Sequence, residues 1–253
     1  MDSGTSPSSL TASGYERIAR AGLGGAAEVW KAKTTDGRFV ALKIAHHEGA
    51  HEALAREAMH ALLAISPRLP ALIDAGFLDG DTNVPFLALQ WIEGTNLRDW
   101  LRKERSDRHQ AALQITHDVA EALADLHSVG LAHGDLKPEN IVVDEHHRAA
   151  LIDLGLSGSA YETTLEGATP RYLATGDNDL GDARARDLLA LGIVVAELID
   201  ADVAAASTPL VNARSANLPA PFDTICTALL TRNPSARPTA RWVVETARAA
   251  LAT

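Results

Sequence analysis

His133-Gly134-Asp135-Leu136-Lys137-Pro138-Glu139-Asn140 is the stretch of this chain that decides its fold and its chemistry. It places a carboxylate, an ammonium and a carboxamide in one short segment, and the proline in it prevents a regular helix. The apolar runs 120–126 and 141–143 lie on either side and give this polar loop a rigid base. Further along, Asp153-Leu154-Gly155 follows the apolar run 149–152. Carboxylate and amide oxygens at strand ends suit magnesium and a transferring phosphate, so the sequence predicts a phosphoryl-transfer site here.

Composition limits the class of protein. The chain has 253 residues, of which 46% are hydrophobic, and can bury a large core, although we expect residues 1–13, rich in Ser, Gly and Thr, to be disordered. The net charge of -10 argues against general nucleic-acid binding. The single cysteine, Cys226, permits no internal disulfide and fits a reducing cytoplasm. The longest apolar run, 188–199, is too short to span a bilayer, and the polar N-terminus does not match a signal peptide, so we expect no membrane association.

The first third of the chain has the pattern of an antiparallel sheet. Strand-like runs at 15–21, 26–32 and 38–44 are joined by short turns, and two more runs at 72–78 and 85–92 complete five strands. Between the first two lies Gly22-Leu23-Gly24-Gly25-Ala26-Ala27-Glu28-Val29, whose glycines let backbone N–H groups approach a phosphate. Alone, such a loop is more often a flexible turn. Residues 52–63 are helical in pattern, with four apolar positions on one side: Leu54, Ala58, Ala61 and Leu62.

The rest of the chain has mainly helical patterns. Helices are predicted at 96–105 and 109–129, and a strand pair at 141–143 and 149–152. One buried stripe is expected on the second helix, formed by Ile115, Val119, Ala122, Leu123 and Leu126. Asp187 is predicted to open the most apolar helix. Its carboxylate either accepts backbone N–H bonds from the loop around Asp135 or is an N-terminal acid favoured by the helix dipole.

Together these motifs resemble the protein kinase superfamily, and bacterial-type Ser/Thr protein kinases in particular. The resemblance runs from about residue 15 to 251. It implies an α+β, bilobal protein-kinase-like fold. The N-lobe, 14–93, would be a small antiparallel five-stranded sheet with one main helix that binds nucleotide. The C-lobe, 94–253, would be larger, mainly helical and responsible for catalysis and substrate binding.

The resemblance also implies roles in catalysis. Asp135 would orient the acceptor hydroxyl and accept its proton, and Lys137 would steady the γ-phosphate. Lys43, paired with Glu57, would hold the α- and β-phosphates, with Glu52 as a competing partner. Two further roles complete the set: Thr169 of the substrate-docking loop would contact Asp135 and Lys137, and Asn140 and Asp153 would hold Mg²⁺, with Mn²⁺ as an alternative.

ATP is the cofactor that the resemblance implies. Leu89 would gate the pocket, and backbone groups near Gln90 and Ile92 would bind the adenine edge. Asn96 either caps the next helix or lies near the ribose. The full set of implied nucleotide contacts is Gly22, Gly24, Gly25, Val29, Ala41, Lys43, Leu89, Gln90, Ile92, Asn96 and Val142.

Several positions depart from the family pattern. Ala27 replaces the third glycine of the loop, and Leu154 replaces the usual Phe after Asp153. Gly134 replaces the arginine that grips a loop phosphate, so we expect activity not to require phosphorylation of the five hydroxyls in this segment, Ser157, Ser159, Tyr161, Thr163 and Thr164. The closing Pro-Glu is absent, and Asp177 is predicted to pair with Arg237 in place of that glutamate.

Three functions fit these motifs. Small-molecule phosphotransferases of the aminoglycoside and choline kinase type share the H-G-D-x-x-x-x-N loop. Lys137-Pro138-Glu139, the glycine loop, the docking loop and Arg237 favour a protein kinase instead. A pseudokinase scaffold is disfavoured because Lys43, Asp135, Asn140 and Asp153 are all present. The sequence therefore predicts a Ser/Thr protein kinase whose partners are ATP and a protein substrate, with neither nucleic acid nor membrane.

Overall fold

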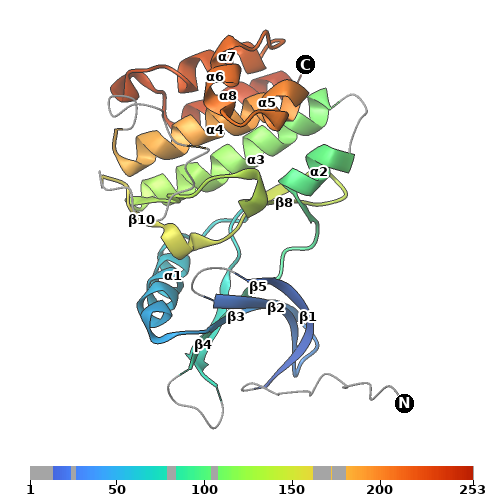
Figure 1. The fold of residues 1–253 in the computed structure, drawn as a ribbon, viewed down its shortest axis with the longest axis vertical. Helices are drawn as coiled ribbons and strands as arrows, with labels where there is room; N and C mark the ends of the chain where they lie inside the picture. Colours follow the sequence, from blue (N-terminus) through green and yellow to red (C-terminus); the bar gives the residue numbers. More distant parts are fainter. Residues whose placement is uncertain are drawn as a thin grey trace. The chain divides into compact units, whose positions relative to one another are not determined.

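The computed structural model describes residues 14–23, 27–78, 84–103, 108–161, 172 and 181–252 (Figure 1). The predicted disordered tail, 1–13, lies outside these residues. The chain divides into two compact units. The first unit comprises the described residues up to Leu62 together with Pro70–Ile92, and the second comprises Leu63–Leu69 and the described residues from Glu93 onward. The separate nucleotide-binding and catalytic roles of the two predicted lobes stay a prediction.

An antiparallel sheet of five strands forms most of the first unit, in the order β1-β2-β3-β5-β4 (Figure 1). This confirms the predicted sheet, with boundaries shifted by one or two residues. The strands are β1 (Tyr15–Leu23), β2 (Ala27–Thr34), β3 (Phe39–Ala45), β4 (Leu72–Phe77) and β5 (Pro85–Gln90).

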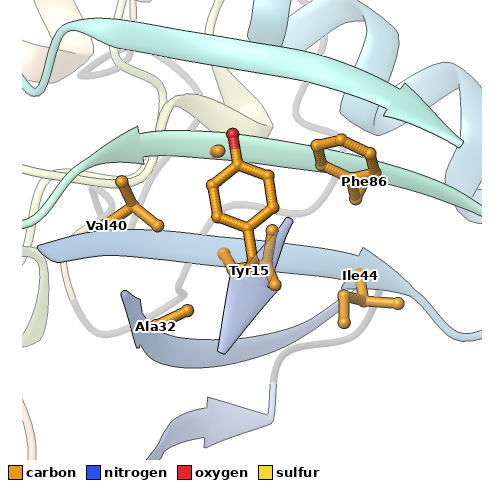
Figure 2. Close-up of a cluster of buried hydrophobic side chains, with 7 residues drawn as sticks. Tyr15, Ala32, Val40, Ile44 and Phe86 are labelled. Atoms are coloured by element: carbon orange, nitrogen blue, oxygen red, sulfur yellow. The ribbon is translucent and has the colours of Figure 1, made fainter. Parts of the chain in front are cut away.

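One face of this sheet carries a hydrophobic core, shown in Figure 2. The rings of Tyr15 and Phe86 meet edge to face with their centroids 5.6 Å apart, a favoured arrangement of aromatic pairs. The Tyr15 hydroxyl donates to Asp74 Oδ2 at 3.0 Å, so the polar end of this ring is satisfied. The other members are Ala32, Val40, Leu42, Ile44 and Ala88. This core therefore joins four of the five strands, β1, β2, β3 and β5.

Helix α1 (His51–Leu63) confirms the helix predicted between the third and fourth strands. Its buried residues are Leu54, Glu57, His60 and Ala61. Leu62, predicted on the same side as Leu54 and Ala61, does not share their burial, because it is 64% exposed. One residue beyond Ala61 turns the helix by about 100°, which carries Leu62 off the buried face.

The second unit is mainly helical (Figure 1). Helix α3 (His109–Ser128) buries the whole predicted stripe and packs against α4 and α8. Among the described residues, no helix is both long enough and apolar enough to cross a membrane. The remaining helices are α2 (Leu97–Lys103), α4 (Ala183–Ile199), α5 (Ala201–Ala205), α6 (Pro209–Ser215), α7 (Phe222–Leu229) and α8 (Ala240–Leu251).

Helix α4 begins earlier than the sequence pattern indicated. Asp182 is its N-cap and accepts the Ala185 N–H at 2.8 Å, so the helix starts at Ala183. Asp187 was expected to open this helix, but it lies in the second turn and is buried. A position this far along is beyond the first turn, where the helix dipole acts most strongly. The burial of Asp187 at this position is therefore explained by the groups that its carboxylate binds.

Short strands support the loop around Asp135. The strands β6 (Thr95–Asn96), β8 (Ile141–Val143) and β9 (Ala149–Leu151) form one sheet, and β7 (Leu131–Ala132) pairs with β10 (Gly158–Ser159). The pair β8–β9 confirms the predicted strand pair, with the second strand one residue shorter than expected. Gly94 precedes β6 with a φ of +147°, and a Cβ there would overlap the carbonyl oxygen of Val143. Only glycine fits this close approach of two backbones.

Arg68 explains why the segment Leu63–Leu69 belongs to the second unit. Its guanidinium pairs with Asp118 and Glu121 of α3, each at 3.0 Å, and its carbonyl accepts the Leu151 N–H at 2.8 Å. Asp118 is fully buried and also accepts from Arg148 at 2.9 Å. His117, Asp118 and Glu121 are close enough together to hold a metal ion. The two guanidinium groups already compensate these carboxylates, so the cluster is a structural ion-pair network.

Candidate active site

Lys43 and Glu57 form a buried ion pair in the first unit. Lys43 Nζ lies 2.6 Å from Glu57 Oε1, and the two residues are 8% and 2% exposed. A buried charge is costly unless it is paired, so each of these two charges stabilises the other. The ion pair links strand β3 to helix α1. The competing candidate, Glu52, is exposed on the first turn of α1. The structure therefore selects Glu57 as the partner of Lys43, and the role of this pair toward ATP stays a prediction.

The strand register brings several predicted nucleotide contacts together in the first unit. Val29 is opposite both Gly22 and Lys43, and Ala41 is opposite Leu89. At Gly22 a Cβ would meet no atom within 4 Å, so this stretch of backbone is open to a close approach. Gly24 and Gly25 lie outside the described residues.

Of the remaining predicted nucleotide contacts, Gln90 and Ile92 belong to the first unit, and Asn96 and Val142 belong to the second. Gln90 ends β5 and donates its N–H to the Ala71 carbonyl at 2.8 Å, and Ile92 is the last residue of the first unit. In the second unit Asn96 is opposite Val142. Asn96 Oδ1 accepts the Asp99 N–H at 2.9 Å, so Asn96 caps α2. Its contact with a ribose stays a prediction.

Three polar side chains converge in the loop that precedes β8. Lys137 Nζ lies 2.5 Å from Asp135 Oδ2, and Asn140 Nδ2 donates to the Asp135 carbonyl at 2.9 Å and to its Oδ2 at 3.3 Å. The 3₁₀ turn Pro138–Asn140 brings the amide back to the carboxylate. Asp135 thus has a fixed orientation, which a group that accepts a proton from a substrate requires.

The buried carboxylate of Asp187 is hydrogen-bonded to the backbone of this loop. It accepts the N–H groups of His133 at 2.8 Å and Gly134 at 3.0 Å, and His127 Nε2 donates to it at 3.0 Å. Burial alone would raise the pKa of Asp187, but these donors and the nearby histidines bring it below its usual value. The carboxylate is therefore ionised and serves as the acceptor that the buried backbone needs. Of the two roles predicted for Asp187, the structure shows the contact with the loop.

The ring of His133 contacts the backbone of Asp135. His133 Nε2 is 3.1 Å from the Ile152 carbonyl, and the Asp135 N–H points at His133 Nδ1 at 3.3 Å. A carbonyl can only accept and an N–H can only donate, so Nε2 donates to the Ile152 carbonyl and Nδ1 accepts from the Asp135 N–H. The ring therefore connects the loop of Asp135 to the segment that leads into Asp153.

Asn140 and Asp153 have the chemistry of a magnesium site. The Ile152 N–H donates to the Asn140 carbonyl at 2.8 Å, so the residue directly before Asp153 is bonded to Asn140. Asp153 has a φ of +69° and is exposed. The Asn140 amide nitrogen faces Asp135, which leaves its Oδ1 on the opposite side of the amide. A carboxylate and an amide oxygen are ligands that Mg²⁺ prefers, so the residues fit the ion.

A family model described as "Protein kinase domain" matches residues 15–247. The chain belongs to the protein kinase family. Among its curated relatives is a probable serine/threonine-protein kinase, pknA2 of Bifidobacterium longum, 28% identical over 78% of this chain. A probable serine/threonine-protein kinase PknB of Corynebacterium glutamicum is 30% identical over 73% of the chain. The serine/threonine-protein kinase PknB of Mycobacterium tuberculosis is 27% identical over 92% of it.

These matches cover only part of the relatives. They span 28% of the Bifidobacterium protein, 31% of the Corynebacterium protein and 42% of the Mycobacterium protein. What the kinase family match establishes is therefore the domain. Both the bilobal protein-kinase-like fold class and the resemblance to bacterial-type Ser/Thr kinases are confirmed.

Some residues that the family pattern singles out are not described by the structure. Thr169 of the docking loop lies outside the described residues, and so does Asp177, the expected partner of Arg237. Arg237 is 7% exposed and donates to the carbonyls of Ala185 at 2.8 Å and Thr231 at 3.2 Å. The ion pair with Asp177 stays a prediction.

Sequence reasoning assigned no role to Arg98, which joins two parts of the kinase domain. Arg98 Nε lies 2.9 Å from Glu139 Oε1, and its Nη1 lies 3.3 Å from Glu197 Oε2 of α4. The Tyr172 hydroxyl contacts both Arg98 and Glu197. This role of Arg98 has no sequence signature, because its partners come from three distant segments.

Gly134 is required by the backbone it occupies. Its φ is +81°, and a Cβ there would lie 2.5 Å from the carbonyl oxygen of Leu156. We expect Gly134→Ala to lower the free energy of unfolding by about 1–3 kcal/mol, because a side chain is strained in this conformation and backbone must shift to admit it. Urea unfolding followed by circular dichroism measures this loss.

Gly22→Ala is the matched control, because a methyl group at Gly22 would meet no atom within 4 Å and its φ is ordinary. Its expected change is within about 0.5 kcal/mol. Equal stability of the two variants would contradict the strained conformation of Gly134.

Proposed function

We propose that this chain is an ATP-dependent Ser/Thr protein kinase. The observation that carries the proposal is the arrangement of Asp135, Lys137 and Asn140 on the buried carboxylate of Asp187. The kinase family match and the names of the relatives support it. The reaction would transfer the γ-phosphoryl of ATP to a serine or threonine hydroxyl of a protein.

Within the second unit, Asp135 would orient the acceptor hydroxyl and take its proton as the oxygen attacks the γ-phosphorus of ATP. The bond from that phosphorus to the bridging oxygen breaks, and ADP leaves. Lys137 would neutralise charge on the transferring phosphoryl group, which its position 2.5 Å from Asp135 supports. Asn140 holds Asp135 through two contacts of its amide and would offer its oxygen to the metal. Catalysis of this kind depends mainly on positioning and charge neutralisation.

Asp153 and Asn140 are the residues that would hold Mg²⁺, which supplies charge neutralisation at the phosphates when bound. In the first unit, Lys43 would bind the α- and β-phosphates. Glu57 would keep the Lys43 ammonium extended from β3 toward them. The nucleotide contacts, the choice of Mg²⁺ over Mn²⁺ and the contact of Thr169 with Asp135 and Lys137 are part of this proposal.

The two alternatives predict different products. A small-molecule phosphotransferase would label an aminoglycoside or choline, and a scaffold would label nothing. The test incubates the purified chain with Mg²⁺ and γ-labelled ATP, with mixed proteins in one tube and aminoglycosides or choline in another. We expect label in protein only. Label confined to the small molecules would overturn the proposal.

Phosphorylation of the segment after Asp153 is not expected to switch this enzyme on. Ser157 can be removed from the candidate acceptors, because it is buried and its hydroxyl donates to the Leu154 carbonyl. Ser159 and Tyr161 are exposed, and Thr163 and Thr164 lie outside the described residues. Gly134 offers no side chain to grip a phosphate, so an added phosphate gains no contact there and shifts no equilibrium through it.

Replacing Ser159, Thr163 and Thr164 by Ala and Tyr161 by Phe should therefore leave the initial rate on an external protein within about tenfold of wild type. The double variant Ser215→Ala/Thr224→Ala, which removes two exposed hydroxyls elsewhere in the second unit, is the control. A loss of about a hundredfold or more, roughly 2.7 kcal/mol of barrier, would show that loop phosphorylation is the switch.

A cytoplasmic location, with no nucleic-acid or membrane partner, is proposed on composition. It is supported by the net charge of -10 and by the single cysteine, Cys226, which is buried in α7.

A further inference from the structure

One lysine of the five-stranded sheet contacts two aromatic rings. Lys31 Nζ lies 4.5 Å from the centroid of the Phe39 ring and 4.9 Å from the centroid of the Trp91 ring. Lys31 is on β2, Phe39 begins β3, and Trp91 directly follows β5. An ammonium within about 6 Å of a ring centroid is attracted to the face of that ring. One side chain therefore links three neighbouring segments of the sheet, and we call Lys31, Phe39 and Trp91 the lysine stack.

The strand register places the lysine stack on the face of the sheet that carries the predicted nucleotide contacts. Lys31 is opposite Ala41, and two residues earlier along β2 Val29 is opposite Lys43. Residues that are opposite each other, or two apart along one strand, share a face of a sheet. The intervening residues of β2 and β3 belong to the hydrophobic core of Figure 2, which occupies the other face. The ammonium of Lys31 is therefore on the same side of the sheet as Lys43.

Trp91 lies between the two residues whose backbone is proposed to bind the adenine edge, Gln90 and Ile92. The pairing of β3 with β5 ends with Val40 opposite Gln90, so Trp91 is one residue beyond the ladder. Its indole Nε1 is buried and has no hydrogen-bond partner within the part of the chain that the structure describes. The position of this ring therefore depends on packing and on the contact with Lys31.

The lysine stack is partly shielded from water. Lys31 and Trp91 are half-buried, and Phe39 is 44% exposed. A cation–π contact becomes stronger as water is removed from it. Two such contacts on one ammonium restrict the Lys31 side chain, and through it the ring of Trp91.

We propose that the lysine stack positions the segment Gln90–Ile92 for the adenine of ATP. By holding the Trp91 ring, Lys31 and Phe39 fix the backbone on either side of it in the conformation that accepts the adenine edge. All three are positioning residues that act through this backbone. The inference rests on the proposed ATP-dependent kinase function and adds residues that set its affinity for the nucleoside part of ATP.

Calorimetry on the full chain tests this inference with two probes, adenosine and a non-hydrolysable ATP analogue with Mg²⁺. Lys31→Met keeps the length of the side chain and removes the ammonium. We expect this variant to raise the dissociation constants of both probes by about fivefold. Adenosine has no phosphate, so an equal loss for both probes places the effect at the nucleoside. A loss confined to the ATP analogue would show that Lys31 attracts the phosphates instead, and would overturn the inference.

Three further variants complete the comparison. Lys31→Arg should restore binding of both probes, because a guanidinium also stacks on aromatic faces. Trp91→Leu should weaken adenosine binding although Lys31 is kept. Lys33→Gln is the matched control, because it removes an exposed lysine two residues further along β2, and it should leave both dissociation constants unchanged. If Trp91→Leu does not fold, the loss in Lys31→Met and its recovery in Lys31→Arg decide the outcome.

Steady-state transfer separates positioning from a general loss of structure. Lys31→Met should raise KM for ATP about fivefold and leave kcat within about twofold, because the lysine stack acts on binding of the nucleoside before the chemical step. A variant that merely contains less folded protein would show a lower kcat with an unchanged KM.

The outcomes distinguish this inference from the proposed function. Unchanged KM and unchanged dissociation constants in Lys31→Met overturn the role of the lysine stack and leave the kinase function standing. Weaker binding of both probes in Lys31→Met, restored in Lys31→Arg, with no transfer to any protein by wild type, supports the lysine stack and contradicts the kinase function. A wild type that binds neither probe contradicts both.

Discussion

Asp135→Asn should reduce phosphoryl transfer by about 10²–10⁴-fold, because it removes the carboxylate that is placed to take the hydroxyl proton while preserving the shape of the side chain. The contacts that Asn140 makes with the Asp135 carbonyl, and that Asp187 makes with the preceding backbone, do not depend on this carboxylate. We therefore expect unchanged folding and nearly unchanged binding of ATP. Initial rates at saturating ATP, with binding measured by calorimetry, test this directly.

Asp125→Asn is a suitable control, because Asp125 is a partly exposed acid of α3 that pairs with Arg241 of α8. It should keep wild-type turnover. Retained turnover in Asp135→Asn would mean that a different base operates and that the assignment of the catalytic loop is wrong.

Breaking the buried Lys43–Glu57 pair should have the second largest effect. Lys43→Met leaves the Glu57 carboxylate buried without its lysine, and Glu57→Leu does the converse, so each single variant should lose about 3–5 kcal/mol of unfolding free energy. Both should also lose turnover, because Lys43 is the proposed phosphate ligand and Glu57 orients it. Urea unfolding and transfer assays on the two variants give the two readouts.

The double variant Lys43→Met/Glu57→Leu decides the interpretation. Replacing both charges by apolar side chains removes the unpaired charge, so stability should recover toward wild type while transfer stays absent. Strictly additive losses of stability would show that the two side chains do not interact in solution.

The sequence predicted most of the fold because its strongest signals are local. Alternation and short turns located the five strands, and apolar periodicity located α3 with its buried stripe. The misplaced features depended on geometry that periodicity alone does not resolve. Leu62 satisfied the apolar pattern of α1 but lies about 100° from Ala61 around the helix, and Asp182, not Asp187, caps α4.

The candidate site was predictable to the extent that its residues lie in short motifs. Asp135, Lys137 and Asn140 are within one stretch, and the structure brings them into contact. The pairing of Lys43 with Glu57 over Glu52 needed the face of α1 that packs on the sheet. The ion-pair networks between residues far apart in the chain left no pattern in the sequence. Asp118 with Arg68 and Arg148, and Arg98 with Glu139 and Glu197, assemble only when separate segments meet.

The most direct test of the central claim is the amount of phosphoserine and phosphothreonine formed on a protein acceptor per molecule of this chain. Wild type and Asp135→Asn are incubated in parallel with Mg²⁺ and ATP, and phosphorylated residues are quantified by mass spectrometry. We predict many phosphorylated hydroxyls per wild-type molecule and at most about a hundredth as many with Asp135→Asn. Absence of phosphoserine and phosphothreonine with wild type, or equal amounts with both proteins, would contradict the account.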